Sequence, residues 1–242
     1  KYMQFEKKKQ NILLQEKKQK NNNLLQIKKD LRLKQLPIHI ECFDNSNFQG
    51  TSPVAACVVF KNGKPSKKDY RLFNIKTIIG PDDFGSMEEV VYRRYKRLLS
   101  ERKKTPQLII IDGGKGQLSS AIKSLKKLKL SGEIAIIGIA KKLEEIYFPN
   151  DPIPLYLDKR STSLKLIQHL RNEAHRFGIN HHRKKRSNLS LASSLDEIVG
   201  IGPKTIDLII NHFGSVSSLM KSKISDVEKI IGKAKTKKIF KL

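Results

Sequence analysis

The chain has 242 residues, with 49 Lys or Arg against 23 Asp or Glu, so its formal net charge is +26. Its longest unbroken apolar run, Val54 to Phe60, is far shorter than the roughly 20 residues of a membrane-spanning helix. No apolar signal-peptide core opens the chain, so we expect no export and a cytoplasmic location. The excess of positive charge indicates nucleic acid as a partner, although an A/T-rich genome also raises the Lys content.

Residues 1–36 are polar and basic, which predicts a helical lead-in with little apolar surface to bury. Residue 1 is Lys, not Met, as expected for a piece of a longer protein. Residues 37–180 then alternate between short apolar runs and amphipathic stretches. We expect strands at 38–43, 54–60, 70–75, 108–111 and 134–139, helices at 86–101, 115–128 and 163–177, and a hairpin at 146–157. This order predicts an α/β domain with a mixed sheet flanked by helices.

A second boundary is expected at residues 181–190, a basic linker, and residues 191–242 leave room only for short helices and tight turns. The final segment is therefore predicted to be a small all-α domain. Cys42 and Cys57 lie inside apolar runs without metal-ligand spacing, so we expect two buried thiols.

Three carboxylates stand at expected element ends. Asp44 ends the first strand, Asp112 ends the fourth, and Asp83 precedes the first long helix. If the first and fourth strands are neighbours, Asp44 and Asp112 face each other, and such a group repels itself unless a cation lies between its members. Mg²⁺ or Mn²⁺ suits these oxygen ligands and promotes phosphodiester hydrolysis. The alternative for each Asp alone is a turn or a helix N-cap.

His175 lies at the border of the apolar stripe of the helix at 163–177. At that place it can reach a cleft, bind a metal or transfer a proton. A structural role is the alternative for any single His, and we interpret His169 of the same helix as structural.

Basic residues near these carboxylates are candidates for phosphate contacts. Lys115 follows a Gly-rich turn that lacks the Walker spacing, which argues against a nucleotide triphosphatase and favours approach of a nucleic-acid backbone. Arg93 and Arg94 either contact DNA or form a solvated helix face. The run Arg183, Lys184, Lys185 and Arg186 either binds nucleic acid or only links two domains.

Near the C-terminus, Gly200 and Gly202 are followed by Lys204 in the pattern of a helix-hairpin-helix motif. The glycines allow a tight turn and expose backbone N–H groups to a phosphate at the start of a helix. A second, imperfect copy contains only Gly232. Two such hairpins can grip both strands of a duplex.

Taken together, the segments Ile40 to Asp44, Gly80 to Phe84, Ile111 to Gln117 and Arg171 to His175 resemble the C-terminal half of UvrC, the incision subunit of the bacterial UvrABC excision-repair nuclease. The resemblance covers about residues 36–242. It implies an RNase H-like endonuclease domain followed by a tandem helix-hairpin-helix domain. It also implies that the chain lacks the family's N-terminal nuclease domain and most of its UvrB-binding segment.

By the same resemblance, Asp44, Asp83, Asp112 and His175 match the catalytic residues of a metal-dependent 5′ incision beside a lesion. The implied partners are damaged double-stranded DNA and UvrB, with UvrA indirectly. Two departures are Asn47, where many relatives have His, and the single glycine of the second hairpin. The leading hypothesis is a DNA endonuclease. The alternatives are a DNA-binding scaffold that no longer cuts and a structure-specific resolvase.

Overall fold

The structure is a computed structural model, and it describes residues 21–46, 54–76, 82–140 and 143–240, together with Glu6, Gln15 and Gln19. Within these ranges the side chains of Ser46, His182, 184–190 and Ser193 are not described. The chain divides into two compact units, Lys1–Gly178 and Ile179–Leu242. No helix in the described part is both long and apolar enough to cross a membrane.

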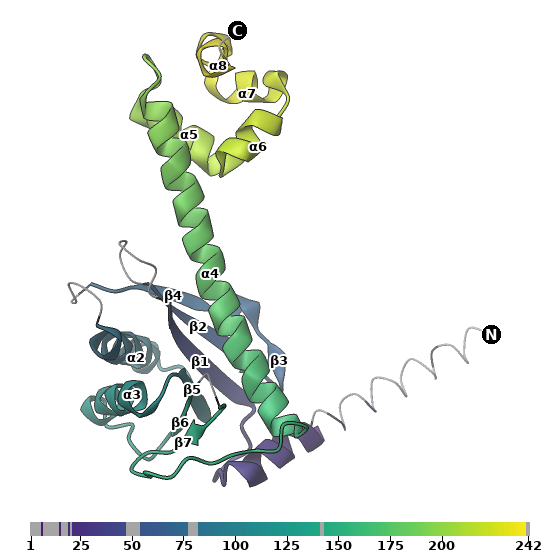
Figure 1. The fold of residues 1–242 in the computed structure, drawn as a ribbon, viewed down its shortest axis with the longest axis vertical. Helices are drawn as coiled ribbons and strands as arrows, with labels where there is room; N and C mark the ends of the chain where they lie inside the picture. Colours follow the sequence, from purple (N-terminus) through teal and green to yellow (C-terminus); the bar gives the residue numbers. More distant parts are fainter. Residues whose placement is uncertain are drawn as a thin grey trace. The chain divides into compact units, whose positions relative to one another are not determined.

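A seven-stranded mixed sheet forms the first unit, as the apolar pattern predicts (Figure 1). The strands are β1 His39–Ser46, β2 Val54–Lys61, β3 Lys64–Pro65, β4 Arg71–Asn74, β5 Leu108–Asp112, β6 Ala135–Ile139 and β7 Ile146–Tyr147. Their order is β3-β2-β1-β5-β6-β7, and β4 also pairs with β2. β1 runs antiparallel to β2 and parallel to β5, so β1 and β5 end at the same edge of the sheet.

Helices cover both faces of this sheet. α2, Asp83–Ser100, and α3, Lys115–Lys127, lie side by side on one face (Figure 1). α4, Thr162–Asp196, begins on the other face. α2 starts at residue 83 because the Asp82 carboxylate accepts hydrogen bonds from the backbone N–H groups of Phe84 and Gly85, the ordinary geometry of an N-cap. Successive side chains of a strand point to opposite faces, so Glu41 of β1 meets α2 while Asp44 meets α4.

The lead-in differs from the prediction in one respect. Residues 21–30 are helical, but Leu24, Ile27 and Leu31 are at most 2% exposed and belong to the core of the first unit. Their spacing of three and four residues places them on one helix face. Asp30 also accepts a hydrogen bond from the hydroxyl of Ser163 at 2.6 Å, which ties this helix to the start of α4. Residues 21–31 are therefore part of the domain, whereas most of residues 1–20 lie outside the described part.

The second unit is helical, and its helices after α4 are α5 Pro203–Phe213, α6 Val216–Lys221, α7 Ile224–Ile231 and α8 Lys233–Phe240. Its apolar core includes Leu191, Leu195, Ile206 and Val227. The predicted end of a helix near Phe177 is wrong, because α4 continues to Asp196. The basic linker predicted at 181–190 is thus helical rather than a loop.

Candidate active site

Two aspartates lie near the ends of neighbouring parallel strands, Asp112 as the last residue of β5 and Asp44 two residues before the end of β1. The register pairs Cys42 with Ile110 and Phe43 with Ile111, so Asp44 and Asp112 occupy the next position of β1 and β5. Their residues are only 1% and 3% exposed. Because these positions share one face of the sheet, the two carboxylates converge, as predicted from the strand ends.

His175 joins them from α4. Its Nδ1 atom lies 3.0 Å from Oδ2 of Asp44, and its side chain is 49% exposed. One ligand atom from each of Asp44, Asp112 and His175 can be chosen so that all three lie within 4.8 Å of one another. α4 crosses the sheet on the face to which Asp44 points, and this crossing brings a residue more than 130 positions away to the strand ends. His169, one and a half turns earlier, instead packs edge-on against Phe60, with ring centroids 4.9 Å apart, in line with its predicted structural role.

The donor set of this group fits a hard divalent cation. Two buried carboxylates this close repel each other, and a cation between them removes that repulsion. Carboxylate oxygens with one imidazole nitrogen match the ligands that Mg²⁺ and Mn²⁺ accept. The same negative field acts on Cys42, where burial first, and the charges of Asp112 and Asp44 next, raise the pKa of the thiol. The predicted burial of both cysteines is confirmed.

Asp83 does not belong to the three-residue group. It is exposed in the first turn of α2. Its backbone carbonyl accepts a hydrogen bond of 2.9 Å from the side-chain amide of Asn45, the residue that follows Asp44. The start of α2 is therefore tied to the end of β1, although the carboxylate of Asp83 stands outside the group. Gly80 and Pro81, which precede it in the matched segment, lie outside the described residues.

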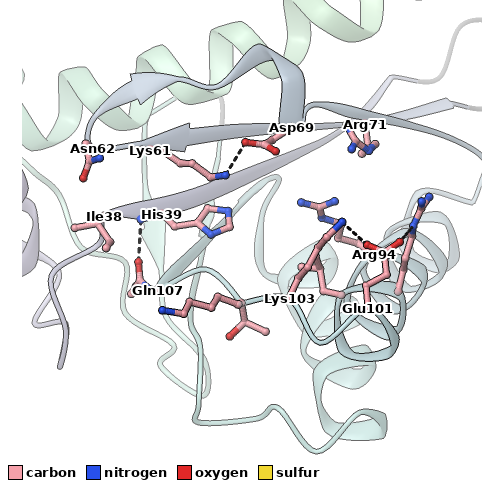
Figure 2. Close-up of a pocket in the computed structure, with 14 residues that line it drawn as sticks. Ile38, His39, Lys61, Asn62, Asp69, Arg71, Arg94, Glu101, Lys103 and Gln107 are labelled. Carbon is pink, nitrogen blue, oxygen red and sulfur yellow. Dashed lines mark hydrogen bonds and ion pairs between the residues drawn. The ribbon is translucent and has the colours of Figure 1, made fainter.

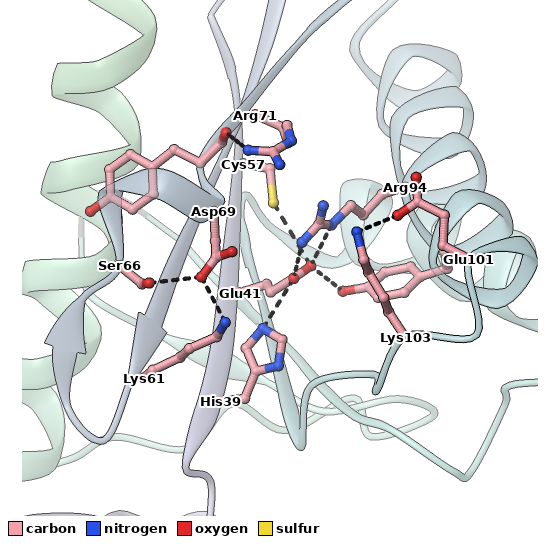
Figure 3. A network of polar contacts seen from close by, with 12 residues as sticks. His39, Glu41, Cys57, Lys61, Ser66, Asp69, Arg71, Arg94, Glu101 and Lys103 are labelled. Atoms are coloured by element: carbon pink, nitrogen blue, oxygen red, sulfur yellow. Dashed lines mark hydrogen bonds and ion pairs between the residues drawn. The ribbon is translucent and has the colours of Figure 1, made fainter.

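Arg94 is a correction to the sequence prediction. Its side chain is buried and forms two hydrogen bonds with Glu41, Nη2 to Oε1 at 2.5 Å and Nε to Oε2 at 3.2 Å (Figure 3). Glu41 is fully buried and also accepts hydrogen bonds from the hydroxyl of Tyr95 at 3.0 Å and from the thiol of Cys57 at 3.8 Å. His39 lies 3.2 Å from the same carboxylate. Arg94 thus holds a buried network together and is not free to contact DNA.

Arg93 and Lys115 are also engaged within the protein. Arg93 donates hydrogen bonds of 2.7 Å to the carboxylate of Glu89 and to the backbone carbonyl of Asn74. The ammonium of Lys115 donates to the carbonyl of Pro152 at 2.8 Å and lies over the ring of Tyr147. Lys115 therefore fastens the segment after β7 to the start of α3, and any contact to a phosphate would share that ammonium group.

The second unit contains the two predicted glycine turns. Gly200 and Gly232 have φ values of +89° and +84°, and Gly202 caps the N-terminus of α5. Lys204 is exposed in the first turn of α5. A Cβ at Gly200 would meet Nζ of Lys238, which donates to the carbonyl of Val199 at 3.1 Å, so α8 packs onto the first turn.

The basic run lies within α4. Arg183 is exposed, whereas the side chains of Lys184, Lys185 and Arg186 lie outside the described part. Sequence reasoning missed the Glu41 network and the link from Asn45 to Asp83. The available signal for the network was a carboxylate, Glu41, between the apolar residues Ile40 and Cys42 of β1.

Comparison with known proteins agrees with this geometry. A family model described as the UvrC RNAse H endonuclease domain matches residues 28–179. Two curated relatives named UvrABC system protein C, from Flavobacterium psychrophilum and Flavobacterium johnsoniae, are 62% and 60% identical over 239 residues. Each alignment covers 99% of this chain and 40% of the relative, so the chain spans less than half the length of these proteins.

A more distant curated relative has the same name. The UvrABC system protein C of Chlorobaculum tepidum is 45% identical over 90% of this chain and 34% of its own length. Among solved structures, Bacillus subtilis endonuclease V matches 64% of this chain and 89% of its own with 12% identity and a TM-score of 0.34, too low to compare their sites. The family model and the close relatives cover both the sheet and the segments that carry Asp44, Asp112 and His175. This chain belongs to the UvrC family.

Proposed function

We propose that the first unit is a metal-dependent DNA endonuclease that makes the 5′ incision beside a lesion in nucleotide excision repair. The observation that carries this proposal is the convergence of Asp44, Asp112 and His175 at one sheet edge, in a domain of the UvrC endonuclease family. Two buried carboxylates and an imidazole in this arrangement serve no packing purpose, because apolar side chains would fill the same space without repulsion.

Asp44 and Asp112 are the residues that would hold Mg²⁺ or Mn²⁺, with His175 at the exposed side of the pair. A bound ion would lower the pKa of a water molecule attached to it and would neutralise negative charge on the phosphoryl oxygens. The two carboxylates hold fixed positions because Asp112 ends β5 and Asp44 lies near the end of β1, both of them inner strands of the sheet.

His175 is placed to move a proton. A carboxylate only accepts hydrogen bonds, so the ring donates through Nδ1–H to Oδ2 of Asp44 and leaves Nε2 as an acceptor. Since half of the side chain is exposed, Nε2 can take a proton from water or return one to the leaving oxygen. Asp44 then has two roles, as a ligand and as the group that orients the imidazole.

Asp83 remains a proposed third acid. Its place beside Asn45 keeps it near the end of β1, and its exposure leaves its carboxylate accessible from solvent. We also propose that the hairpin unit anchors damaged duplex DNA without reading bases, and that UvrB, delivered with UvrA, brings the lesion to this chain. Incision beside a lesion takes place on the chromosome, hence in the bacterial cytoplasm.

The decisive variant is Asp112→Asn, tested on a duplex that carries a lesion and a nick, in the presence of UvrB. We expect cleavage to fall by more than about 100-fold, because even outer partners of metal ligands are worth about 10–100-fold. Duplex affinity in EDTA stays at the wild-type value, because removing one negative charge beside the DNA does not weaken phosphate contacts. The matched control is Asp158→Asn, an exposed carboxylate that accepts a hydrogen bond from the backbone N–H of Arg160.

Metal removal separates cutting from binding. EDTA should stop wild-type cleavage, and added Mg²⁺ or Mn²⁺ should restore it, while the affinity for duplex changes little. Full cleavage by Asp112→Asn would end the catalytic assignment. A wild-type chain that binds the same duplex and never cuts it, with or without metal, would instead favour the non-cutting scaffold.

A further inference from the structure

A pocket of about 450 Å³ opens at the end of the sheet opposite to the candidate active site (Figure 2). Its walls are the start of β1, the end of β2, the start of β4, the C-terminal end of α2 and the loop before β5. Sites for small ligands have volumes of about 300–1,000 Å³. Asp44, Asp112 and His175 do not line this pocket, so it is separate from the group that we assign to catalysis.

Positive charge dominates the walls. Six cationic side chains face two carboxylates: Lys61, Arg71, Arg94, Arg97, Lys103 and Lys104 against Asp69 and Glu101. Glu41, which lies behind Arg94, adds a third carboxylate and leaves an excess of three positive charges. Such a concave, cationic surface concentrates anions.

The two wall carboxylates are already satisfied by cations. Hydrogen bonds from Lys103 and Arg97, both at 2.6 Å, lower the pKa of Glu101 to about 2. A hydrogen bond from Lys61, also 2.6 Å long, lowers the pKa of Asp69 to about 2. Both groups therefore stay ionised at neutral pH, and each is matched by at least one cation.

Other cations keep their charge for a ligand. The guanidinium of Arg71 donates to the backbone carbonyls of Lys68 and Tyr70, at 2.9 and 2.6 Å, and pairs with no described carboxylate. Lys104 has no hydrogen bond or ion pair with any residue that the structure describes. Arg94, at the inner wall, is instead paired with Glu41 and adds no uncompensated charge.

Neutral donors complete the lining. The side-chain oxygen of Gln107 accepts from the backbone N–H of His39 at 2.8 Å, which leaves its amide N–H₂ as a donor. Asn62 and Thr105 add an amide and a hydroxyl. Phosphate oxygens accept hydrogen bonds and prefer donors fixed by their surroundings, especially guanidinium groups.

The geometry points to a phosphate-binding site in this pocket, which neither the family match nor the proposed active site assigns. Its ligand carries phosphate and is at most of nucleotide size where it enters the pocket. The phosphate comes either from a free phosphorylated compound or from a DNA strand that passes this end of the sheet. Arg71 and Lys104 supply the uncommitted charges.

The test uses inorganic pyrophosphate as the probe, titrated calorimetrically into the whole chain in EDTA, so that it is independent of cleavage. We expect the double variant Arg71→Gln/Lys104→Gln to bind pyrophosphate at least about tenfold more weakly, which corresponds to a loss of about 1.4 kcal/mol in binding free energy. The matched control is Lys123→Gln/Lys126→Gln, which removes two exposed charges from α3, away from the pocket. Lys104→Gln alone serves if the loss of the Arg71 backbone contacts affects folding, and we expect it to weaken binding too.

Titration of the same variants with a fluorescent duplex identifies the source of the phosphate. A loss of duplex affinity confined to the pocket variant assigns the phosphate to DNA, and unchanged duplex affinity assigns it to a free compound. Absence of pyrophosphate binding by the wild-type chain, or equal losses in the pocket and α3 variants, would overturn the proposal.

Discussion

At the scale of single residues, Glu41 is a carboxylate enclosed in the core of the first unit. Burial raises the pKa of its carboxyl group, but hydrogen bonds and charge from His39 and Arg94 outweigh that effect and lower the pKa overall. The carboxylate is therefore charged and fully enclosed, with Arg94 as its counter-ion. Such a pair is costly to break, because the remaining charge stays buried.

Glu41→Gln should destabilise the first unit by about 3–5 kcal/mol, because Arg94 would keep a buried charge without a partner. Urea unfolding followed by circular dichroism measures this change. Replacing both charges, in Glu41→Leu/Arg94→Met, should restore most of the lost stability, since no unpaired charge remains. Wild-type stability in the single variant would show that the pair does not hold the sheet to α2.

Asp69 gives a pH-dependent contribution. Its pKa lies at about 2 in the folded chain, against 3.8 without its partners, chiefly because Lys61 donates a hydrogen bond to it. A folded pKa below the unfolded value adds stability above the unfolded value, and this stability is lost as the pH falls from about 4 to about 2. Asp69→Asn should therefore unfold with a shallower dependence of the urea midpoint on pH across that window. An identical slope in variant and wild type would contradict this assignment.

At the scale of elements, the sheet was predictable because apolar runs and their breaks follow the strands closely. The end of α4 was not. The charged run after Phe177 contains no apolar pattern, yet no Gly or Pro interrupts it between Gly178 and Gly200, and Lys and Arg favour helix. Leu191 and Leu195, one turn apart, then bury the last turns of the helix in the second unit. The absence of helix-breaking residues was the better signal.

The candidate site was partly predictable for a related reason. Strand ends identify Asp44 and Asp112 because β5 follows β1 at the same edge, a consequence of topology. The direction of a helical side chain depends on which face packs inward, which charge alone does not reveal. Arg94 therefore appeared to be a surface cation, although the sheet places Glu41 directly beneath it.

The glycine turns of the second unit allow a paired prediction. Gly232 has φ +84° and ψ 156°, a region that residues with a Cβ rarely enter, whereas Gly202 has φ −91°. Gly232→Ala should therefore lower the stability of the second unit by about 1–3 kcal/mol, and Gly202→Ala should change it much less. Neither added Cβ meets another atom within 4 Å, so the difference isolates backbone strain. Thermal unfolding measures both, and equal losses would mean that the turn relaxes.

At the scale of the whole molecule, a net charge of +26 makes any duplex affinity strongly dependent on salt. In the proposed DNA-binding unit, two lysines each stand at the start of a helix that follows a glycine turn. Lys204 lies in the first turn of α5 after two glycines, and Lys233 opens α8 after one. Both residues are exposed. In contrast, Lys235 and Lys238 bind back onto Thr205 and Val199 and are committed to packing.

If the hairpins hold the DNA backbone, Lys204→Gln should reduce the slope of log K against log salt by about 0.9, the value of one phosphate contact on duplex DNA. We expect a smaller reduction for Lys233→Gln, because the second turn lacks the glycine that frees backbone N–H groups before α5. Fluorescence anisotropy in EDTA at several salt concentrations measures both slopes, with Lys126→Gln of α3 as the control for overall charge. Equal slopes for Lys204→Gln and Lys126→Gln would mean that only the total charge, and not the hairpin, attracts the duplex. The base sequence of the duplex should not alter the ranking, because phosphate contacts carry no sequence information.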